Sequence, residues 1–157
     1  MPENLLASVD LGSNSFHMLV VRQVEGGFAV VDRLREMVRL ASGLDESGHL
    51  SEESVQRALE CLARFGQRLR AIKPGRVRVV GTNTFRRAKG AETFLARAQA
   101  VLGHPVEIIA GREEARLIFL GAAHSLPAGE RRRLVVDIGG GSTEVISGIG
   151  LEVQQLD

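Results

Sequence analysis

"VVDIGGGSTEV", residues 135–145, places an aspartate and three consecutive glycines between two apolar runs that are typical of β-strands. Glycine at such positions costs about 0.5–1 kcal/mol relative to alanine, so three in succession indicate that another group approaches the main chain closely. A phosphate fits this requirement, because successive N–H groups in a tight glycine turn point into a concavity that binds anions. A tight hairpin turn is the alternative, and it needs only one or two glycines.

The same pattern occurs near the N-terminus, in "ASVDLGSNSFHMLVV" at residues 7–21. Each copy has an apolar strand that ends in Val-Asp, then Leu or Ile, a glycine, a polar turn with serine, and a second strand. A glycine turn follows each copy, "EGG" at 25–27 and "GIG" at 148–150. Two copies so far apart in the chain predict two related lobes instead of a solenoid of many repeats.

The two loops together supply the residue types that hold a polyphosphate from both sides. Backbone N–H groups, hydroxyls and one amide provide the donors. The predicted phosphate-binding residues of the loops are Gly12, Ser13, Asn14, Ser15, Gly139, Gly140, Gly141, Ser142 and Thr143. Asp10 and Asp137 end the strands beneath the loops, where phosphate would repel their carboxylates unless a cation intervened. We therefore expect Mg²⁺ between the aspartates and the phosphates.

Length and composition narrow the possible classes of protein. With 157 residues, 44% hydrophobic and 25% charged, the chain fits one globular domain, or one domain and the start of another. No apolar run reaches the ~20 residues that span a bilayer, and the N-terminus has no export signal. A net charge of +1 and the absence of Trp and Tyr argue against nucleic-acid binding. Cys61 is the only cysteine, which excludes an internal disulfide and suits the cytoplasm.

Along the chain, a β-meander is expected first and alternating strands and helices afterwards. The predicted strands of the meander are 5–10, 15–24 and 28–34, and His17 is expected to pack within its strand. Ser51 is expected to cap a helix over 52–72. Further strands are predicted at 76–81 and 106–110, and further helices at 91–103 and 112–123. This alternation adds parallel strands to the meander, and the polar stretch 124–133 is expected to be a linker.

Four segments carry a resemblance to a known family: "VDLGSNSFHMLV" at 9–20, "GTNTFRRA" at 81–88, "GREEARLIFLG" at 111–121 and "VVDIGGGSTE" at 135–144. The chain resembles the exopolyphosphatase and guanosine pentaphosphate phosphohydrolase family, within the superfamily of actin and the sugar kinases. The resemblance implies an α/β, ribonuclease H-like (actin-like ATPase) fold with a mixed five-stranded sheet and flanking helices. Residues 1–125 would form this lobe, and 126–157 would form a linker and the opening β-hairpin of a second, truncated lobe.

The resemblance also assigns roles to single residues. It implies that a glutamate of the Glu-Glu-Ala segment acts on the attacking water, and we expect Glu114 in this role. Glu113 would then be a neighbour that binds metal or pairs with Arg116, and Arg86 would bind a phosphate. The expected metal ligands are Asp10, Asp137 and Glu144. From the residues alone, acidic side chains that open a helix are already favoured by the helix dipole, and Arg86 could be an ordinary surface arginine.

The implied reaction is Mg²⁺-dependent hydrolysis of the terminal phosphoanhydride of inorganic polyphosphate, which releases orthophosphate. Removal of the terminal phosphate of guanosine pentaphosphate is the alternative within the family, and "GGGS" instead of "GGAS" at 139–142 favours polyphosphate. An actin-like kinase or ATPase, or a polyphosphate-binding module without catalysis, stays open as another class. We expect a homodimer in the full-length protein and no nucleic-acid or membrane partner.

Overall fold

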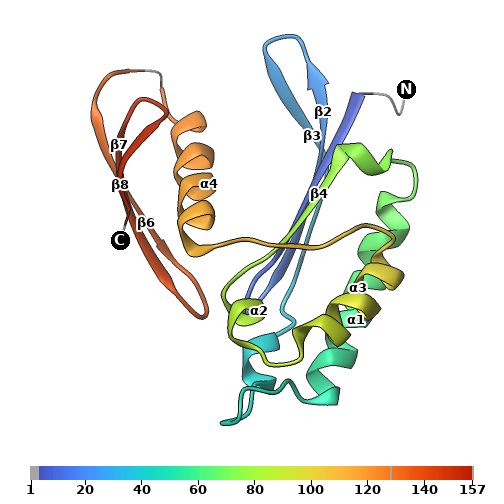
Figure 1. The fold of residues 1–157 in the computed structure, drawn as a ribbon. Coiled ribbons are helices and arrows are strands. Elements are labelled where there is room, and N and C mark those ends of the chain that lie inside the picture. The colour runs from blue at the N-terminus through green and yellow to red at the C-terminus, as the bar shows by residue number, and fades with distance from the viewer. Residues whose placement is uncertain (1–3, 128, 157) are drawn as a thin grey trace.

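The computed structural model describes residues 4–127 and 129–156, which form two sheets with helices (Figure 1). The first sheet begins with an antiparallel meander of β1 (Leu5–Leu11), β2 (Phe16–Val24) and β3 (Gly27–Glu36). β4 (Val77–Gly81) pairs parallel to β1, and β5 (Glu107–Ile108) pairs parallel to β4. The order β3-β2-β1-β4-β5 confirms the predicted mixed five-stranded sheet.

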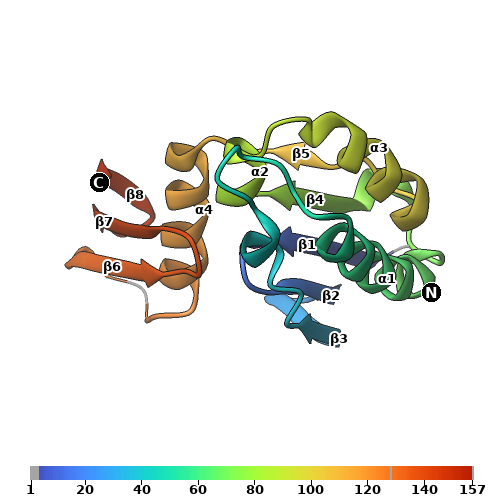
Figure 2. The ribbon, with the colours of Figure 1, turned by 90° about the horizontal axis from the view of Figure 1, so that it is seen from below.

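Helices α1 (Glu52–Leu69) and α3 (Ala91–Leu102) pack on each other and cover one face of this sheet (Figure 2). Ser51 caps α1 as predicted, because its hydroxyl accepts a hydrogen bond from the N–H of Ser54 at 3.3 Å. α3 ends at Gly103, whose φ of 80° is the left-handed conformation that glycine adopts without strain.

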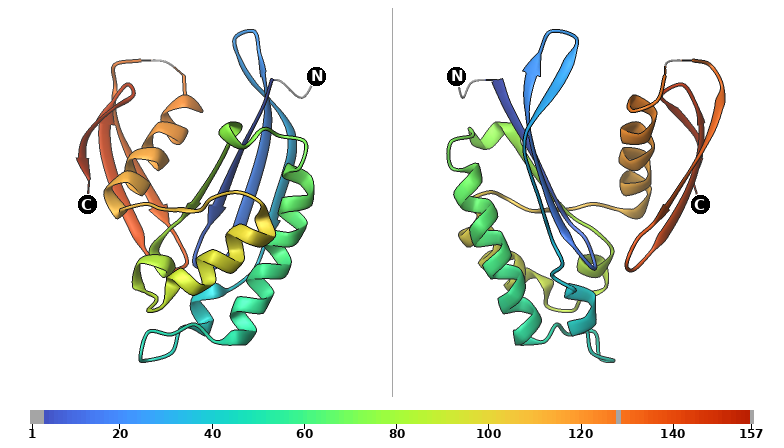
Figure 3. Two further views of the ribbon diagram at one scale, coloured as in Figure 1. Left: turned by 45° about the vertical axis from the view of Figure 1, so that its right-hand side comes forward. Right: turned by 180° about the vertical axis from the view of Figure 1, so that it is seen from behind.

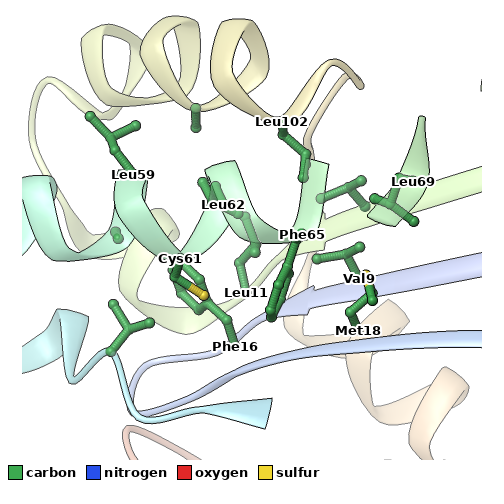
Figure 4. Packing of buried hydrophobic residues seen from close by; sticks show 14 of the residues in the cluster. Val9, Leu11, Phe16, Met18, Leu59, Cys61, Leu62, Phe65, Leu69 and Leu102 are labelled. Carbon is green, nitrogen blue, oxygen red and sulfur yellow. The ribbon is translucent and has the colours of Figure 1, made fainter. Parts of the chain in front are cut away.

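The core lies between the sheet and these two helices (Figure 4). Side chains that alternate along β1 and β2 point into it, and apolar residues at helical spacing in α1 meet them. Fully buried members of this core include Val9, Leu11, Phe16, Met18, Leu62, Phe65 and Leu69. Asp10 and His17 lie on the opposite face of β1 and β2, away from this core.

The second sheet consists of β6 (Arg132–Ile138), β7 (Thr143–Ile149) and β8 (Glu152–Leu156), antiparallel and in that order. α4 (Gly111–His124) packs on it through Phe119, which is fully buried together with Ile146 of β7. The chain beyond residue 125 thus forms three strands, one more than the expected hairpin. α4 precedes the expected boundary yet packs with these strands, and the division at residue 125 stays a prediction.

The first sheet differs from the expectation in its short elements. α2 (Asn83–Arg87) is a helix of one turn where only a polar turn was expected. β5 has two residues instead of five, and α1 ends three residues early. Short 3₁₀ helices lie at Leu40–Gly43, between β3 and α1, and at Pro74–Arg76, between α1 and β4. In the described part of the chain, none of the helices combines the length and apolar character that crossing a membrane requires.

Candidate functional site

The repeat seen in the sequence is also a repeat of backbone geometry. The N–H of Gly12 donates to the carbonyl oxygen of Ser15 at 3.2 Å, and the N–H of Gly139 donates to that of Ser142 at 2.9 Å. The first turn joins β1 to β2 and the second joins β6 to β7, each antiparallel. The two segments therefore form the same turn at the end of the same kind of strand pair.

The two turns lie close together and line one cleft of about 470 Å³ (Figure 3). Most of the predicted site residues lie in its lining, which is Asp10, Gly12, Ser13, Asn14, Ser15, His17, Arg35, Thr82, Glu114, Asp137, Ile138, Gly139, Gly140, Gly141, Ser142 and Glu144. Three predicted site residues, Arg86, Glu113 and Thr143, lie outside it. The structure thus brings both loops, the three expected metal ligands and one of the two glutamates into a single site.

The glycine run of the second loop is explained by its contact with the first loop. A Cβ atom added to Gly140 would lie 2.6 Å from the Cβ of Asn14, and one added to Gly141 would lie 2.6 Å from Oγ of Ser13. The Nδ2 of Asn83 also donates a hydrogen bond to the carbonyl oxygen of Gly141 at 2.7 Å. The close approach predicted for this backbone is therefore confirmed for protein atoms, and approach by a phosphate stays a prediction.

The first loop is fixed from behind by residues that follow β3 and β4. Thr84 donates its hydroxyl hydrogen to Oγ of Ser13 at 2.7 Å, and both side chains are buried. The N–H of Ala41 donates to the carbonyl oxygen of Ser13 at 2.9 Å, and the N–H of Arg39 donates to that of Asn14 at 2.7 Å. A loop held in this way presents its remaining donors in a fixed arrangement.

The two glutamates at the start of α4 point in different directions. Oε2 of Glu114 accepts a hydrogen bond from Nη1 of Arg86 at 2.9 Å, and the Glu114 side chain is only 13% exposed. Burial raises the pKa of the Glu114 carboxyl, and the hydrogen bond from Arg86 partly opposes this. Glu113 instead pairs with Arg116 at 2.8 Å, as the sequence suggested, and this pair lowers its pKa. Of the two, only Glu114 faces the cleft.

Four carboxylates share the cleft and affect one another. Burial, and then the nearby charge of Asp137, raise the pKa of Asp10 to about 6. Glu144 faces Asp137 across the β6–β7 pair and is only 8% exposed. Its Oε2 is buried and has no hydrogen-bond partner among the described residues. A buried carboxylate oxygen without a partner is costly, and a cation beside it would remove that cost.

The acidic residues of the cleft could bind Mg²⁺ only if a bound phosphate supplied some of its oxygen ligands. No three or more His, Cys, Asp or Glu side chains of the described chain are placed so that they could hold a metal ion together. Mg²⁺ is usually bound by one or two carboxylates and completes its shell with water and phosphate oxygens. The unpartnered Oε2 of Glu144 and the repulsion between Asp10 and Asp137 therefore fit an ion that is bound together with phosphate.

Four residues of the lining were not among the predicted site residues, namely His17, Arg35, Thr82 and Ile138, and the first two carry ionisable groups. His17 is not packed within its strand, because it is exposed at the cleft, and its Nε2 lies 2.8 Å from Oγ of Ser15. Arg35 lies opposite His17 in the β2–β3 pair and also lines the cleft. A β-bulge between Val20 and Val21 shifts the register of this strand pair by one residue, so counting back from the glycine turn at 25–27 would have placed residue 34 opposite His17 instead of Arg35.

Comparison with known proteins finds similar sequences and similar structures. Residues 19–157 match the model of the Ppx/GppA phosphatase family. The chain is 51% identical over 152 residues to the guanosine-5'-triphosphate,3'-diphosphate pyrophosphatase of Vibrio vulnificus. The aligned region covers 97% of this chain but only 30% of that protein. A crystal structure of an exopolyphosphatase from Cytophaga hutchinsonii superposes with a TM-score of 0.90 at 30% identity, over 98% of this chain and 49% of that one.

A more distant structure agrees in fold alone. A Bacteroides thetaiotaomicron protein with an actin-like ATPase fold superposes with a TM-score of 0.52 at 8% identity, over 99% of this chain and 70% of its own. The chain therefore has the actin-like arrangement that was expected, and it spans less than a third of the curated relative and about half of the exopolyphosphatase.

Proposed function

We propose, because this chain belongs to the Ppx/GppA phosphatase family, that its cleft binds a chain of phosphate groups and that the protein hydrolyses the terminal phosphoanhydride bond of inorganic polyphosphate. The observation that carries the proposal is the cleft itself. Two matched glycine turns and the carboxylate of Glu114 line the same space, so anion-binding backbone and a candidate base for water lie together.

The turns supply the binding part of the reaction. Their N–H groups and the side chains of Ser13, Asn14, Ser15 and Ser142 would bind phosphate oxygens. Because the first loop is fixed by Thr84, Ala41 and Arg39, these donors need little reorganisation when a phosphate arrives. Binding from two sides would hold the terminal phosphorus in one place, which is the main task in phosphoryl transfer.

Glu114 would orient the attacking water and accept its proton. Its raised pKa suits this role, because a general base works best when its pKa approaches the working pH. The hydrogen bond from Arg86 fixes one carboxylate oxygen, so the other oxygen can face the water. Glu113 would not take this role, because it lies outside the cleft and pairs with Arg116.

One or two of the carboxylates of Asp10, Asp137 and Glu144 would hold Mg²⁺ against the bound phosphates, directly or through its waters. The described lining carries the carboxylates of Asp10, Glu114, Asp137 and Glu144, but the guanidinium of Arg35 alone as a fixed positive charge. Without further cations, a polyanion in this cleft would meet net repulsion. When bound, Mg²⁺ would neutralise charge on the phosphate oxygens and on these carboxylates.

The lining favours inorganic polyphosphate over a nucleotide. Among the described residues it contains no Phe, Tyr or Trp and a single apolar side chain, Ile138, so it offers little surface on which a guanine base could stack. Guanosine pentaphosphate is the second candidate, and it is supported by the 51% identity to a protein named for that substrate.

The test is orthophosphate release by the purified protein from long-chain polyphosphate, guanosine pentaphosphate and ATP, with Mg²⁺ and with a chelator. We expect release from polyphosphate that needs Mg²⁺. Glu114→Gln should lower kcat by about 10²–10⁴-fold, because it removes the base and keeps the shape of the side chain. Glu113→Gln is the matched control and should stay near wild type. Turnover that survives Glu114→Gln would refute the role of this residue, and release from ATP alone would refute the substrate.

A further inference from the structure

Arg35 is the one arginine or lysine in the lining of the cleft, among the residues that the structure describes. Arg86, which was expected to bind phosphate, lies outside this lining, and its phosphate binding stays a prediction. Its Nη1 donates to Glu114 at 2.9 Å and to the carbonyl oxygen of Ile109 at 2.8 Å. The positive charge that a bound polyanion would meet directly is therefore that of Arg35.

The guanidinium of Arg35 has no carboxylate partner in the described chain. The acidic residues next to it on β3 are turned to helix α1, where Asp32 pairs with Arg68 at 2.9 Å and Glu36 pairs with Arg64. Among the described residues, the guanidinium of Arg35 donates one weak hydrogen bond, from Nη2 to Sδ of Met37 at 4.0 Å. Its donors are thus free to bind an anion, and a guanidinium suits phosphate because it donates two parallel hydrogen bonds.

Arg35 and Glu114 lie toward opposite ends of the site. Across the sheet, Arg35 of β3 pairs with His17 of β2, and His17 pairs with Asp10 of β1. Neighbouring strands are about 4.8 Å apart, so Arg35 lies about 10 Å from Asp10 along this row. Glu114 lines a neighbouring pocket together with Asp10, Val80 of β4 and Ile109. β4 lies on the other side of β1 from β2 and β3, as the strand order in Figure 2 shows. A group bound at Arg35 is therefore distant from a bond that is cleaved at Glu114.

His17, between them, adds hydrogen bonding but little charge. Burial and the charge of Arg35 lower the pKa of its imidazole, so the ring is neutral at pH 7. Its Nε2 lies 2.8 Å from Oγ of Ser15 in the first loop. In the row of cross-strand neighbours Asp10, His17 and Arg35, the guanidinium of Arg35 is therefore the fixed positive charge.

We propose that Arg35 forms a distal phosphate subsite, which binds a phosphate group of the substrate several groups away from the bond that is hydrolysed. This inference rests on the proposed function of the cleft. It predicts that the protein prefers linear substrates with several phosphate groups, because only these reach from Glu114 to Arg35. Removal of Arg35 should weaken binding of long substrates and leave the hydrolytic step itself intact.

The test compares Arg35→Gln, Arg35→Lys and the control Arg33→Gln in the purified protein. Arg33 has the same charge and lies two residues away on the same face of β3, outside the lining of the cleft. KM and kcat are measured with long-chain polyphosphate and with tripolyphosphate. A charge-assisted hydrogen bond contributes about 1.5–3 kcal/mol, so Arg35→Gln should raise KM for the long chain by at least about tenfold.

The pattern of effects separates a subsite from a structural role. We expect kcat to change less than twofold, KM for tripolyphosphate to change little, Arg35→Lys to restore part of the affinity, and Arg33→Gln to match wild type. An unchanged KM for the long chain in Arg35→Gln, or an equal rise in Arg33→Gln, would overturn the subsite.

Titration of long-chain polyphosphate into the Glu114→Gln protein, with and without Arg35→Gln, provides a readout that does not need turnover. If the wild-type protein hydrolysed none of the substrates, the proposed function would fail, and this titration would still decide the subsite. Equal affinity with and without Arg35 would refute it, and at least tenfold weaker binding without Arg35 would support it.

Discussion

Replacing Gly141 with alanine should impair the site by forcing the two loops apart. The new Cβ would lie 2.6 Å from Oγ of Ser13 and 2.7 Å from Nδ2 of Asn83, whereas ordinary contact begins at 3.4 Å. Ser13 cannot give way easily, because it is buried and hydrogen-bonded to Thr84. The second loop must therefore move, and it must give up the hydrogen bond from Asn83 to do so.

The cost of this change can be estimated from its two parts. Insertion of a methyl group into a packed contact costs about 1–3 kcal/mol, and loss of the Asn83 hydrogen bond costs about 0.5–1.5 kcal/mol. The total of about 1.5–4.5 kcal/mol opposes the close contact between the loops, because each sheet keeps its own core. At about 1.4 kcal/mol per factor of ten, kcat/KM should fall by about tenfold or more.

The assay is orthophosphate release from polyphosphate, with Gly121→Ala as the control. Gly121 lies in α4, and an added Cβ there would meet nothing within 4 Å. Alanine should even stabilise that helix by up to about 1 kcal/mol. We expect wild-type kcat/KM in Gly121→Ala. If Gly141→Ala retained kcat/KM within threefold of wild type, contact between the loops would not be needed for activity.

Three further predictions concern stability and reactivity. Burial lowers the pKa of His104, which is 7% exposed and has an Nδ1 without a hydrogen-bond partner. The stability that depends on its neutral ring is therefore fully present above about pH 6.5 and is lost as the pH falls below this value. Between pH 8 and pH 5.5 the melting temperature of His104→Gln should fall less than that of the wild type, and equal falls would contradict this. Burial and Glu36 raise the pKa of Cys61 to about 12, so a thiol reagent at pH 8 should label it only after unfolding in guanidinium, and rapid labelling of the native protein would count against the burial. Phe119→Ala should lower the free energy of unfolding by about 3–5 kcal/mol in urea titrations, whereas Phe28→Ala, at a site 63% exposed, should cost far less; similar costs would show that α4 is not packed as described.

Features set by short stretches of sequence were predicted well. The meander and α1 follow from alternating apolar residues and from the Ser51 cap, which are signals within a few residues. The paired turns were also predictable, because two copies of one motif constrain each other. α2 was missed because a helix of five residues has too few positions to show a periodic apolar face.

Features set by contacts between distant segments could not be predicted. The apolar face of α4 indicates a helix, but nothing near Phe119 in the sequence says which of two sheets it will cover. The resemblance implied that Arg86 binds phosphate, but its contact with Glu114 of α4 could not be foreseen from the sequence, and phosphate binding by Arg86 stays a prediction. Arg35 looked like any charged residue of an edge strand until the register placed it beside His17.

Among the positions at which the two turns differ is the one opposite the strand-end aspartate, where the first carries His17 opposite Asp10 and the second carries Glu144 opposite Asp137. An inorganic polyphosphate has identical ends and reads the same in either direction, so the molecule itself cannot tell an enzyme which way to enter. A perfectly symmetric pair of turns would accept it both ways. With a neutral ring on one side and a carboxylate on the other, orientation is imposed by the protein alone.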